Sequence, residues 1–425
     1  MYLWLTQRAE PSPHDDGGRR RYMRTGLMAE NFVNNGWDVQ FWTSDFDHFG
    51  GRVRGYGTQV VPVRDGYTMH YLENQGYSKT RSLRRIRSDA KVARDFARVA
   101  RQATRLPDAI IASMPSIDMA LESVRFGLER GVPVIVDIRD LHPDLFIDMA
   151  PPLLRPAIRL ATTPMRARLR EVCRGASAIW GNTDGFVDWG CVAAGRARHR
   201  HDRTFPIAYE PVVLTDAEKN EANRKWDEKG LFKAEDFNIV FFGALSKSFD
   251  FRPVFEAARI LQSQGTRHRF YFFGRGAYEA QVSEHCASSA NSEYMGWAVA
   301  KELQTAMARS QMGLAPYLPI SNYIKNLPNK PTEYMSGGLG VATSLGEGCL
   351  ADILQQSGAG FSYSSGADLA SRLNALAQDR PALASMRAAA SHIFATQFDL
   401  KALSEGMMQA VEALVTDQRP LGERS

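Results

Sequence analysis

Residues 317–343 read YLPISNYIKNLPNKPTEYMSGGLGVAT, and this stretch decides the fold class. It begins at the end of an apolar segment, 312–317, and it closes within a second one, 340–344. The polar block between them predicts a loop and then a short helix with Lys330 and Glu333 on one face. Strand, loop, helix and strand form one βαβ step. Because ligands of open α/β sheets bind where loops leave the carboxyl ends of the strands, we expect a ligand site here.

The same alternation of short apolar segments and helical patterns runs through the chain, so the sequence predicts an α/β protein with two doubly wound domains. We expect the first domain at 1–213 and the second at 214–399, with a helix at about 400–418 that packs back on the first. The predicted strands are 2–5, 39–43, 58–63, 109–112, 132–137, 178–180, 204–207, 238–242, 268–273, 294–297, 312–317, 340–344 and 361–363. The predicted helices include 22–34, 253–264, 300–309, 367–378 and two more at the C-terminal end.

Composition places the chain among folded proteins of a reducing compartment. It has 425 residues, of which 44% are hydrophobic and 23% are charged. No run of eighteen apolar residues occurs, and the first residues have neither the basic nor the apolar region of a signal peptide. The four cysteines are scattered without metal-ligand spacing, which favours buried or idle thiols: Cys173, Cys191, Cys286 and Cys349. We therefore expect a cytoplasmic location.

Basic residues concentrate in two segments of the first half. Between Lys79 and Arg105 the chain has ten Lys and Arg but only two acids, and the helical spacing predicts one basic stripe. That stripe includes Arg84, Arg87, Lys91 and Arg94, beside an expected buried stripe of Leu83, Ile86, Ala90, Ala93, Ala97 and Ala100. Residues 153–174 repeat the pattern with six Arg. The stripe is either a solvated helix face or a surface for anionic lipid headgroups or a diphosphate-bearing acceptor. No nucleic-acid-binding motif occurs.

Two loops of the first half carry candidate functional residues. A glycine pair, Gly17 and Gly18, lies between the first strand and the next helix, where backbone N–H groups can meet an anion. The buried strand 132–137 leads directly into Arg139, Asp140, His142 and Asp144. Packing or capping would explain His142 alone, but the clustering of charged groups at a strand end favours a function.

These motifs together resemble the family-four retaining glycosyltransferases of the GT-B fold, in which two Rossmann-like domains face a central cleft. The resemblance spans nearly the whole chain and is strongest at 328–341, and it is most similar to bacterial enzymes of surface-polysaccharide assembly. It implies transfer of a sugar from a nucleotide-diphosphate sugar to a glycan or a lipid-diphosphate-linked acceptor. It also implies that no metal or other cofactor is needed. Such an enzyme would work as a peripheral protein on the inner face of the plasma membrane.

The resemblance also assigns roles to residues. Glu333 would bind the ribose hydroxyls and Lys330 a phosphate. Lys247 and Arg252 would stabilise the leaving diphosphate, and His142 or Asp140 would contact the transferred sugar. The other implied donor-binding residues are Gly17, Gly18, Gly243, Arg275, Gly296 and Trp297. Lys325 stands where the family often has the first of two glutamates.

Other functions remain open at this point. Asp45-Phe46-Asp47 matches the metal-binding Asp-x-Asp of the other glycosyltransferase fold, although a second Rossmann-like domain contradicts that fold. Gly274-Arg275-Gly276 lacks the third glycine of a dinucleotide site. A nucleotide-sugar epimerase of the same fold and a catalytically silent carbohydrate-binding scaffold are the two remaining alternatives.

Overall fold

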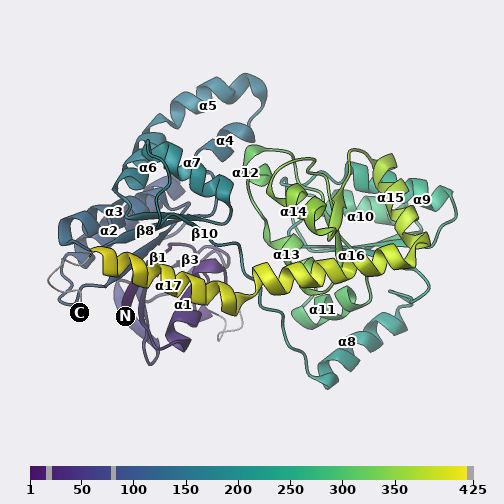
Figure 1. Ribbon diagram of the computed structural model, residues 1–425, viewed down its shortest axis with the longest axis horizontal. Coiled ribbons are helices and arrows are strands. Elements are labelled where there is room, and N and C mark those ends of the chain that lie inside the picture. Colours follow the sequence, from purple (N-terminus) through teal and green to yellow (C-terminus); the bar gives the residue numbers. More distant parts are fainter. Residues whose placement is uncertain (16–21, 78–82, 419–425) are drawn as a thin grey trace. The chain divides into compact units, whose positions relative to one another are not determined.

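The computed structural model describes residues 1–15, 22–77 and 83–418, and it divides into two compact units (Figure 1). Unit 1 comprises Met1–Pro206 and Lys401–Ser425, and unit 2 comprises Ile207–Leu400. The division thus falls at 206/207, whereas the sequence analysis placed it at 213/214. The last helix, α17 (Leu400–Gln418), returns to unit 1, where Met407, Val411 and Leu414 pack into the core.

Unit 1 is built on an eight-stranded sheet in the order β10-β9-β8-β7-β1-β2-β6-β5. All neighbouring strands are parallel except β5 and β6, which form an antiparallel pair. The strands are β1 (Tyr2–Thr6), β2 (Asp38–Ser44), β5 (Gln59–Arg64), β6 (Tyr67–Leu72), β7 (Ala109–Ser113), β8 (Val134–Ile138), β9 (Ala178–Gly181) and β10 (Arg203–Thr204), and a separate hairpin joins β3 (Phe46–Asp47) to β4 (Arg52–Val53). Because β1 has β2 on one side and β7 on the other, the chain reverses its winding direction at β1/β7.

Alternate residues of these strands point to opposite faces of the sheet and pack in two separate cores. Trp4 faces one core with Val92 and Phe96 of α2, whereas Leu3 and Leu5 face the other core with α1 and α17. The helices of unit 1 are α1 (Arg24–Asn34), α2 (Leu83–Ala100), α3 (Ile117–Arg130), α4 (Asp144–Asp148), α5 (Arg155–Ala161), α6 (Thr163–Gly175) and α7 (Asp184–Ala194), with a 3₁₀ turn, η2 (Pro152–Leu154), before α5.

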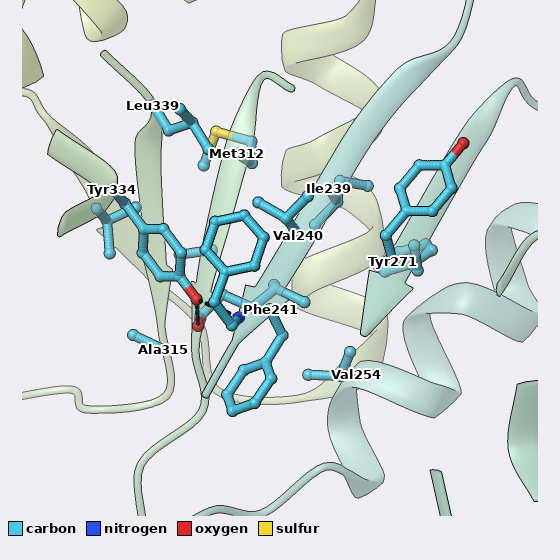
Figure 2. Packing of buried hydrophobic residues seen from close by; sticks show 14 of the residues in the cluster. Ile239, Val240, Phe241, Val254, Tyr271, Met312, Ala315, Tyr334 and Leu339 are labelled. Atoms are coloured by element: carbon cyan, nitrogen blue, oxygen red, sulfur yellow. Dashed lines mark hydrogen bonds between the residues drawn. The ribbon is translucent and has the colours of Figure 1, made fainter. Parts of the chain in front are cut away.

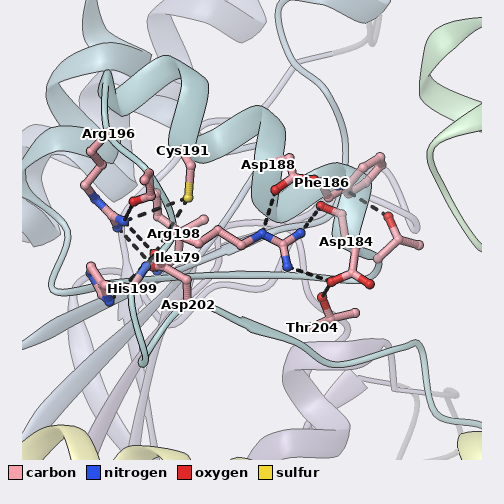
Figure 3. Close-up of polar contacts among 12 residues, drawn as sticks. Ile179, Asp184, Phe186, Asp188, Cys191, Arg196, Arg198, His199, Asp202 and Thr204 are labelled. Carbon is pink, nitrogen blue, oxygen red and sulfur yellow. Dashed lines mark hydrogen bonds and ion pairs between the residues drawn. The ribbon is translucent and has the colours of Figure 1, made fainter.

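The edge strand β10 is only two residues long, and ion pairs hold the loop that precedes it (Figure 3). Arg196 donates to the buried carboxylate of Asp202, which also accepts the backbone N–H of Ile179 in β9 at 2.8 Å. Burial alone would raise the pKa of Asp202, but the hydrogen bonds from Arg196 and the backbone lower it. Arg198 similarly bonds Asp184. Arg196 and Arg198 are therefore explained by ion pairs that fix this loop.

Unit 2 has an all-parallel six-stranded sheet in the order β13-β12-β11-β14-β15-β16, with the winding reversal at β11/β14. Its strands are β11 (Phe237–Phe242), β12 (His268–Phe273), β13 (Ser292–Gly296), β14 (Met312–Ala315), β15 (Gly340–Thr343) and β16 (Gly360–Ser362). Its helices are α8 (Asp216–Glu228), α9 (Arg252–Ser263), α10 (Glu279–Ala287), α11 (Ala300–Ala308), α12 (Ser321–Ile324), α13 (Asn329–Ser336), α14 (Cys349–Ser357), α15 (Gly366–Gln378) and α16 (Arg380–Ile393), followed by a π-helical turn, η3 (Phe394–Phe398).

A tyrosine from α13 closes the gap between β11 and β14 (Figure 2). The two strands pair only at Ile239↔Met312 and Val240↔Gly313. Beyond that point the hydroxyl of Tyr334 accepts the N–H of Phe242 at 3.0 Å and donates to the carbonyl of Leu314 at 3.2 Å. The ring fits because residue 313 is glycine, since a Cβ there would overlap the ring atoms of Tyr334. The side chain thereby fixes α13 to the winding reversal.

The predicted α/β class and the two doubly wound domains are confirmed. Two details were wrong. The strand β6 was not predicted, because Thr68 and His70 interrupt its apolar pattern. Ile86 is 56% exposed rather than buried, because α2 turns Val92 and Phe96 toward the core.

We predict that Tyr334→Phe lowers the free energy of unfolding by about 2 kcal/mol, because two buried backbone groups lose their partner. Tyr271→Phe is the matched comparison, since the Tyr271 hydroxyl accepts a single backbone N–H, that of Phe232. It should cost about 1 kcal/mol. Denaturant unfolding of the full chain measures both. An equal or smaller loss for Tyr334→Phe would contradict the bridging role.

Candidate functional site

In unit 2 the candidate residues Gly243, Lys247, Arg275, Gly296 and Trp297 lie in the loops at the carboxyl ends of β11, β12 and β13, whereas Arg252 begins α9 and Lys330 and Glu333 lie in α13. Backbone hydrogen bonds join these loops: Gly243 donates to Phe273, Gly274 donates to Gly296, and Leu245 donates to Arg275. The loop after β11 also bonds the loop after β14, since Leu318 donates to Ser248 and Asp250 donates to Pro316. Backbone hydrogen bonds thus connect the loops around the winding reversal.

Glycine is required at three places in these loops. Gly243 and Gly274 both have φ of +129°, and Gly276 has φ of +151°, where a side chain would be strained. A Cβ on Gly274 would overlap the Gly243 carbonyl, and one on Gly276 would come within 2.6 Å of the Leu245 carbonyl. These glycines therefore allow close approach of backbone to backbone, and Gly243 additionally leaves room for the Lys330 side chain.

Lys330 projects from the first turn of α13 to the end of β11. Its ammonium lies 4.8 Å from the ring centroid of Phe249 and 5.5 Å from that of Phe241. Aromatic faces attract a cation without neutralising it, so this contact orients the charge. Pro331 is the third residue of α13, where its missing N–H breaks no helical hydrogen bond.

The other predicted donor residues of unit 2 have different environments. Glu333 is half-buried one turn after Lys330, whereas Lys247, Arg275 and Trp297 are exposed. Trp297 is 69% exposed directly after Gly296, and such a ring offers a surface for a planar group. Arg252 forms two hydrogen bonds with Asp250, at 2.7 and 2.8 Å, and this contact lowers the pKa of Asp250. To bind a phosphate, Arg252 would have to break its hydrogen bonds with Asp250.

Lys325, in the position of the expected acid, follows the short helix α12 and is exposed. The neighbouring Asn326 is buried, and its side-chain oxygen has no hydrogen-bond partner among the residues that the structure describes. No acid replaces the missing glutamate at these two positions.

In unit 1 the strand ends carry a buried polar chain that sequence reasoning missed. Arg8, just after β1, lies 2.9 Å from Asp89 of α2 and donates to the hydroxyl of Tyr77 at 3.0 Å. The same hydroxyl lies 2.7 Å from His48, and Arg85 lies 3.6 Å from Asp89. Two guanidinium groups thus share one carboxylate. Two features of the sequence could have indicated these contacts: the position of Arg8 at a strand end and the four-residue spacing of Arg85 and Asp89.

His142 lies near this chain of contacts. Burial, then the charges of Arg85 and Arg8, lower its pKa to about 4. The imidazole is therefore neutral at neutral pH, and a neutral imidazole can donate or accept a hydrogen bond. The backbone carbonyl of Asp140 accepts the N–H of His142 at 2.9 Å, so the structure brings these two predicted residues together. Asp144, in contrast, pairs with Arg166 at 2.7 Å and with Trp189.

Gly17 and Gly18 lie outside the described residues. The start of the following helix is described, and there the buried carboxylate of Glu10 accepts the N–H of Met23 at 2.6 Å. Glu10 also lies 3.7 Å from Arg139, while its burial raises its pKa. An acid of the chain itself therefore sits at the first turn of α1.

Asp45 and Asp47 shape turns. Asp45 accepts the N–H groups of Tyr56 and Gly57, and Asp47 accepts those of Phe49 and Gly50. Within the described ranges no cluster of His, Cys, Asp or Glu has the arrangement of a metal site. The Asp-x-Asp pattern is thus explained by the hairpin.

The predicted basic stripe lies on α2. Arg84, Arg87 and Arg94 are exposed, while Lys91 pairs with Asp95 at 2.8 Å. Across the described part of the chain, no helix is long and apolar enough to cross a bilayer.

We predict that Arg85→Gln raises the pKa of His142 above its value of about 4, because one of the two nearby positive charges is removed. The pKa of His70, also about 4, is lowered by burial alone and should not move. NMR titration of the two imidazoles measures both. Since His142 is neutral when folded, its contribution to stability is present above pH 6.5 and is lost as the pH falls toward 4. An unchanged pKa of His142 in the variant would contradict this placement of the charges.

Residues 236–379 match the family model described as glycosyl transferases group 1. No curated protein sequence matches the chain.

Among solved structures, the chain is similar to Anabaena HepE in complex with UDP, with 14% identity, 97% of this chain and 99% of that chain covered, and a TM-score of 0.65. It is also similar to sucrose-phosphate synthase from Thermosynechococcus elongatus, with 12% identity, 98% and 99% covered, and a TM-score of 0.67. A third is WaaG, described as a glycosyltransferase involved in lipopolysaccharide biosynthesis, with 14% identity, 97% and 99% covered, and a TM-score of 0.62. Residues 236–379 therefore match the glycosyl transferases group 1 family within a chain that has the GT-B fold of these structures, in agreement with the resemblance to GT-B glycosyltransferases stated from the sequence.

Proposed function

We propose that this protein transfers a sugar, with retention of its anomeric configuration, from a nucleotide-diphosphate sugar to a glycan or lipid-linked acceptor in cell-surface polysaccharide synthesis. The observation that carries the proposal is the position of Lys330. Its ammonium is held against Gly243 and two aromatic rings at the winding reversal of unit 2, inside the region that matches the family model.

Each residue of unit 2 has a definite task in this proposal. The carboxylate of Glu333 accepts hydrogen bonds from the two ribose hydroxyls, which a carboxylate does well because both its oxygens are acceptors. Lys330 and Lys247 stabilise the charge that grows on the diphosphate as the glycosidic bond breaks. Arg252 joins them after leaving Asp250. With these cations in place, no metal ion is needed.

The acceptor is assigned to the strand ends of unit 1. His142, as a neutral imidazole, and Asp140 contact the transferred sugar by hydrogen bonds. The buried guanidinium of Arg8 and the half-buried guanidinium of Arg85 suit an acceptor that carries phosphate, because both lie beside Asp89 at the strand ends of unit 1. The exposed arginines of α2 would hold the protein near the anionic membrane surface where a lipid-linked acceptor resides.

The names of similar structures suggest which donors to try first. HepE was crystallised with UDP and with UDP-glucose, and WaaG is named for lipopolysaccharide biosynthesis. A screen of UDP-, GDP- and TDP-sugars by thermal shift would therefore begin with UDP-sugars. Absence of stabilisation by every nucleotide tested would overturn both the transferase and the epimerase of the same fold.

We predict that Glu333→Ala and Lys330→Ala each weaken donor binding by about tenfold to a hundredfold, the cost of losing charge-assisted hydrogen bonds. Isothermal titration calorimetry with the donor from the screen measures the affinity. Matched controls are Glu235→Ala and Lys233→Ala, exposed residues of the same types at the opposite end of β11. The controls should bind like the parent protein. Unchanged affinity in both site variants would reject this site.

We also predict retention without a metal. Slow hydrolysis of the donor, which needs no added acceptor, should first release the sugar in the anomeric configuration of the donor. Early-time NMR detects that anomer before it equilibrates. The rate should be unaffected by EDTA. Release of the opposite anomer would contradict retention, and a rate restored only by Mg²⁺ or Mn²⁺ would contradict metal independence.

A further inference from the structure

The segment 152–161 of unit 1, which comprises η2 and α5, is a helical element without a covered face. None of its residues is buried. Leu153 is 94% exposed, Leu154 is 54% exposed and Leu160 is 77% exposed. In Figure 1, α5 projects from the body of unit 1 beyond α4 and α6. A helix this short gains its stability from packing of an apolar face, so leucines exposed on one small element require an explanation.

The base of this element is firmly packed. The following helix α6 buries Leu169, Val172 and Cys173 in the core. At its start, Thr162 donates to the carbonyl of Ile158 at 2.9 Å and so joins the two helices. The exposed leucines thus lie on an element that is joined to α6, a helix packed into the core.

The segment that carries the leucines is itself basic. Residues 149–170 contain five arginines and no acid. Arg166 and Arg168 pair with Asp144 and Asp118, which lie outside this segment. Arg155 donates to the backbone carbonyls of Ala150 and Asp148, and Arg159 is exposed between Leu154 and Leu160. Apolar side chains interspersed with guanidinium groups are the composition that binds at a headgroup layer.

A candidate acceptor cavity opens beside the same support. A cavity of about 80 Å³ is lined by Arg8 and Asp89, by Ile86 of α2, and by Met165 and Arg168 of α6. Ile86, which is 56% exposed, adds an apolar side chain to its wall. The helix α6, which directly follows the element with the exposed leucines, therefore also lines the cavity that contains Arg8.

We propose that residues 152–161 insert Leu153, Leu154 and Leu160 into the headgroup layer of an anionic bilayer, with Arg155 and Arg159 at the lipid phosphates. A second copy of the chain is disfavoured as the occupant, because a symmetric contact would bring two arginine-rich, acid-free segments together. An anionic lipid surface supplies both the apolar layer and the opposite charge. This anchoring is separate from the basic stripe on α2, which carries charge without a leucine cluster. It is also independent of the proposed sugar transfer, because it requires no donor.

The test is co-sedimentation of the full chain with two kinds of vesicle, pure phosphatidylcholine and an equimolar mixture with phosphatidylglycerol. The parent protein should bind the mixed vesicles and keep part of that binding at high salt, because insertion of leucines is not screened. The double variant Leu153→Ser/Leu154→Ser should lower the partition coefficient at least about tenfold and abolish the salt-resistant part. Arg159→Gln should weaken binding at low salt.

Val213→Ser is the matched control, since Val213 is also 94% exposed but belongs to unit 2. It should bind like the parent. All substituted side chains are exposed, and an unchanged thermal midpoint verifies folding of each variant. Binding of the leucine variant equal to that of the parent would overturn the proposal. So would equal binding to the two kinds of vesicle, or self-association of the parent that the leucine variant abolishes while vesicle binding is absent.

Discussion

The hydroxyl of Tyr334 lies where β11 and β14 stop pairing in unit 2, and the candidate site depends on it. Strands β11 and β14 diverge at the winding reversal, so an N–H of one and a carbonyl of the other would be buried without partners. Tyr334 satisfies both, and it does so from the helix that carries Lys330 and Glu333. The same eight-residue helix therefore provides a hydrogen-bond partner for these two backbone groups and carries the two candidate donor-binding residues. Gly313 is the condition for this arrangement, since any larger residue would displace the ring.

The candidate cations of the two units have different surroundings. In unit 2 the Lys330 ammonium lies against aromatic rings, and Arg252 lies on the surface with Asp250. In unit 1 the Arg8 guanidinium is buried and contacts Asp89 together with Arg85, an arrangement that costs desolvation energy. His142 is neutral because of its burial and, to a smaller extent, because of the charges of Arg85 and Arg8, which lower its pKa further. Unit 1 thus combines fixed cations with an uncharged hydrogen-bonding ring, which suits a phosphate next to a sugar hydroxyl.

Sequence patterns predicted the fold well because both sheets are mostly buried and parallel, so their strands appear as short apolar runs between helices. The helix with Lys330 and Glu333 was also predictable, since its spacing is local. What escaped prediction depends on distant contacts. Nothing near Glu10 in the sequence shows that its carboxylate caps the first turn of α1, and Arg8 meets Asp89 only after the sheet has formed. The exposure of Ile86 had a related cause, because an amphipathic helix of alanines and arginines permits more than one buried face.

The distribution of charge explains why α5 differs from the other basic surfaces of unit 1. Most exposed arginines there have an acid nearby, as in the pairs Arg101–Glu129 and Arg125–Glu171, which contribute little to stability and leave little net charge. Residues 149–170 carry a formal charge of +5 from their five arginines, which equals the net charge of +5 of the whole chain. The remaining residues therefore sum to zero. Arg166 and Arg168 of this stretch pair with Asp144 and Asp118, whereas Arg155 and Arg159 lie in the same short segment as the exposed leucines. Neither the basic charge nor the exposed leucines alone would distinguish a lipid surface from water.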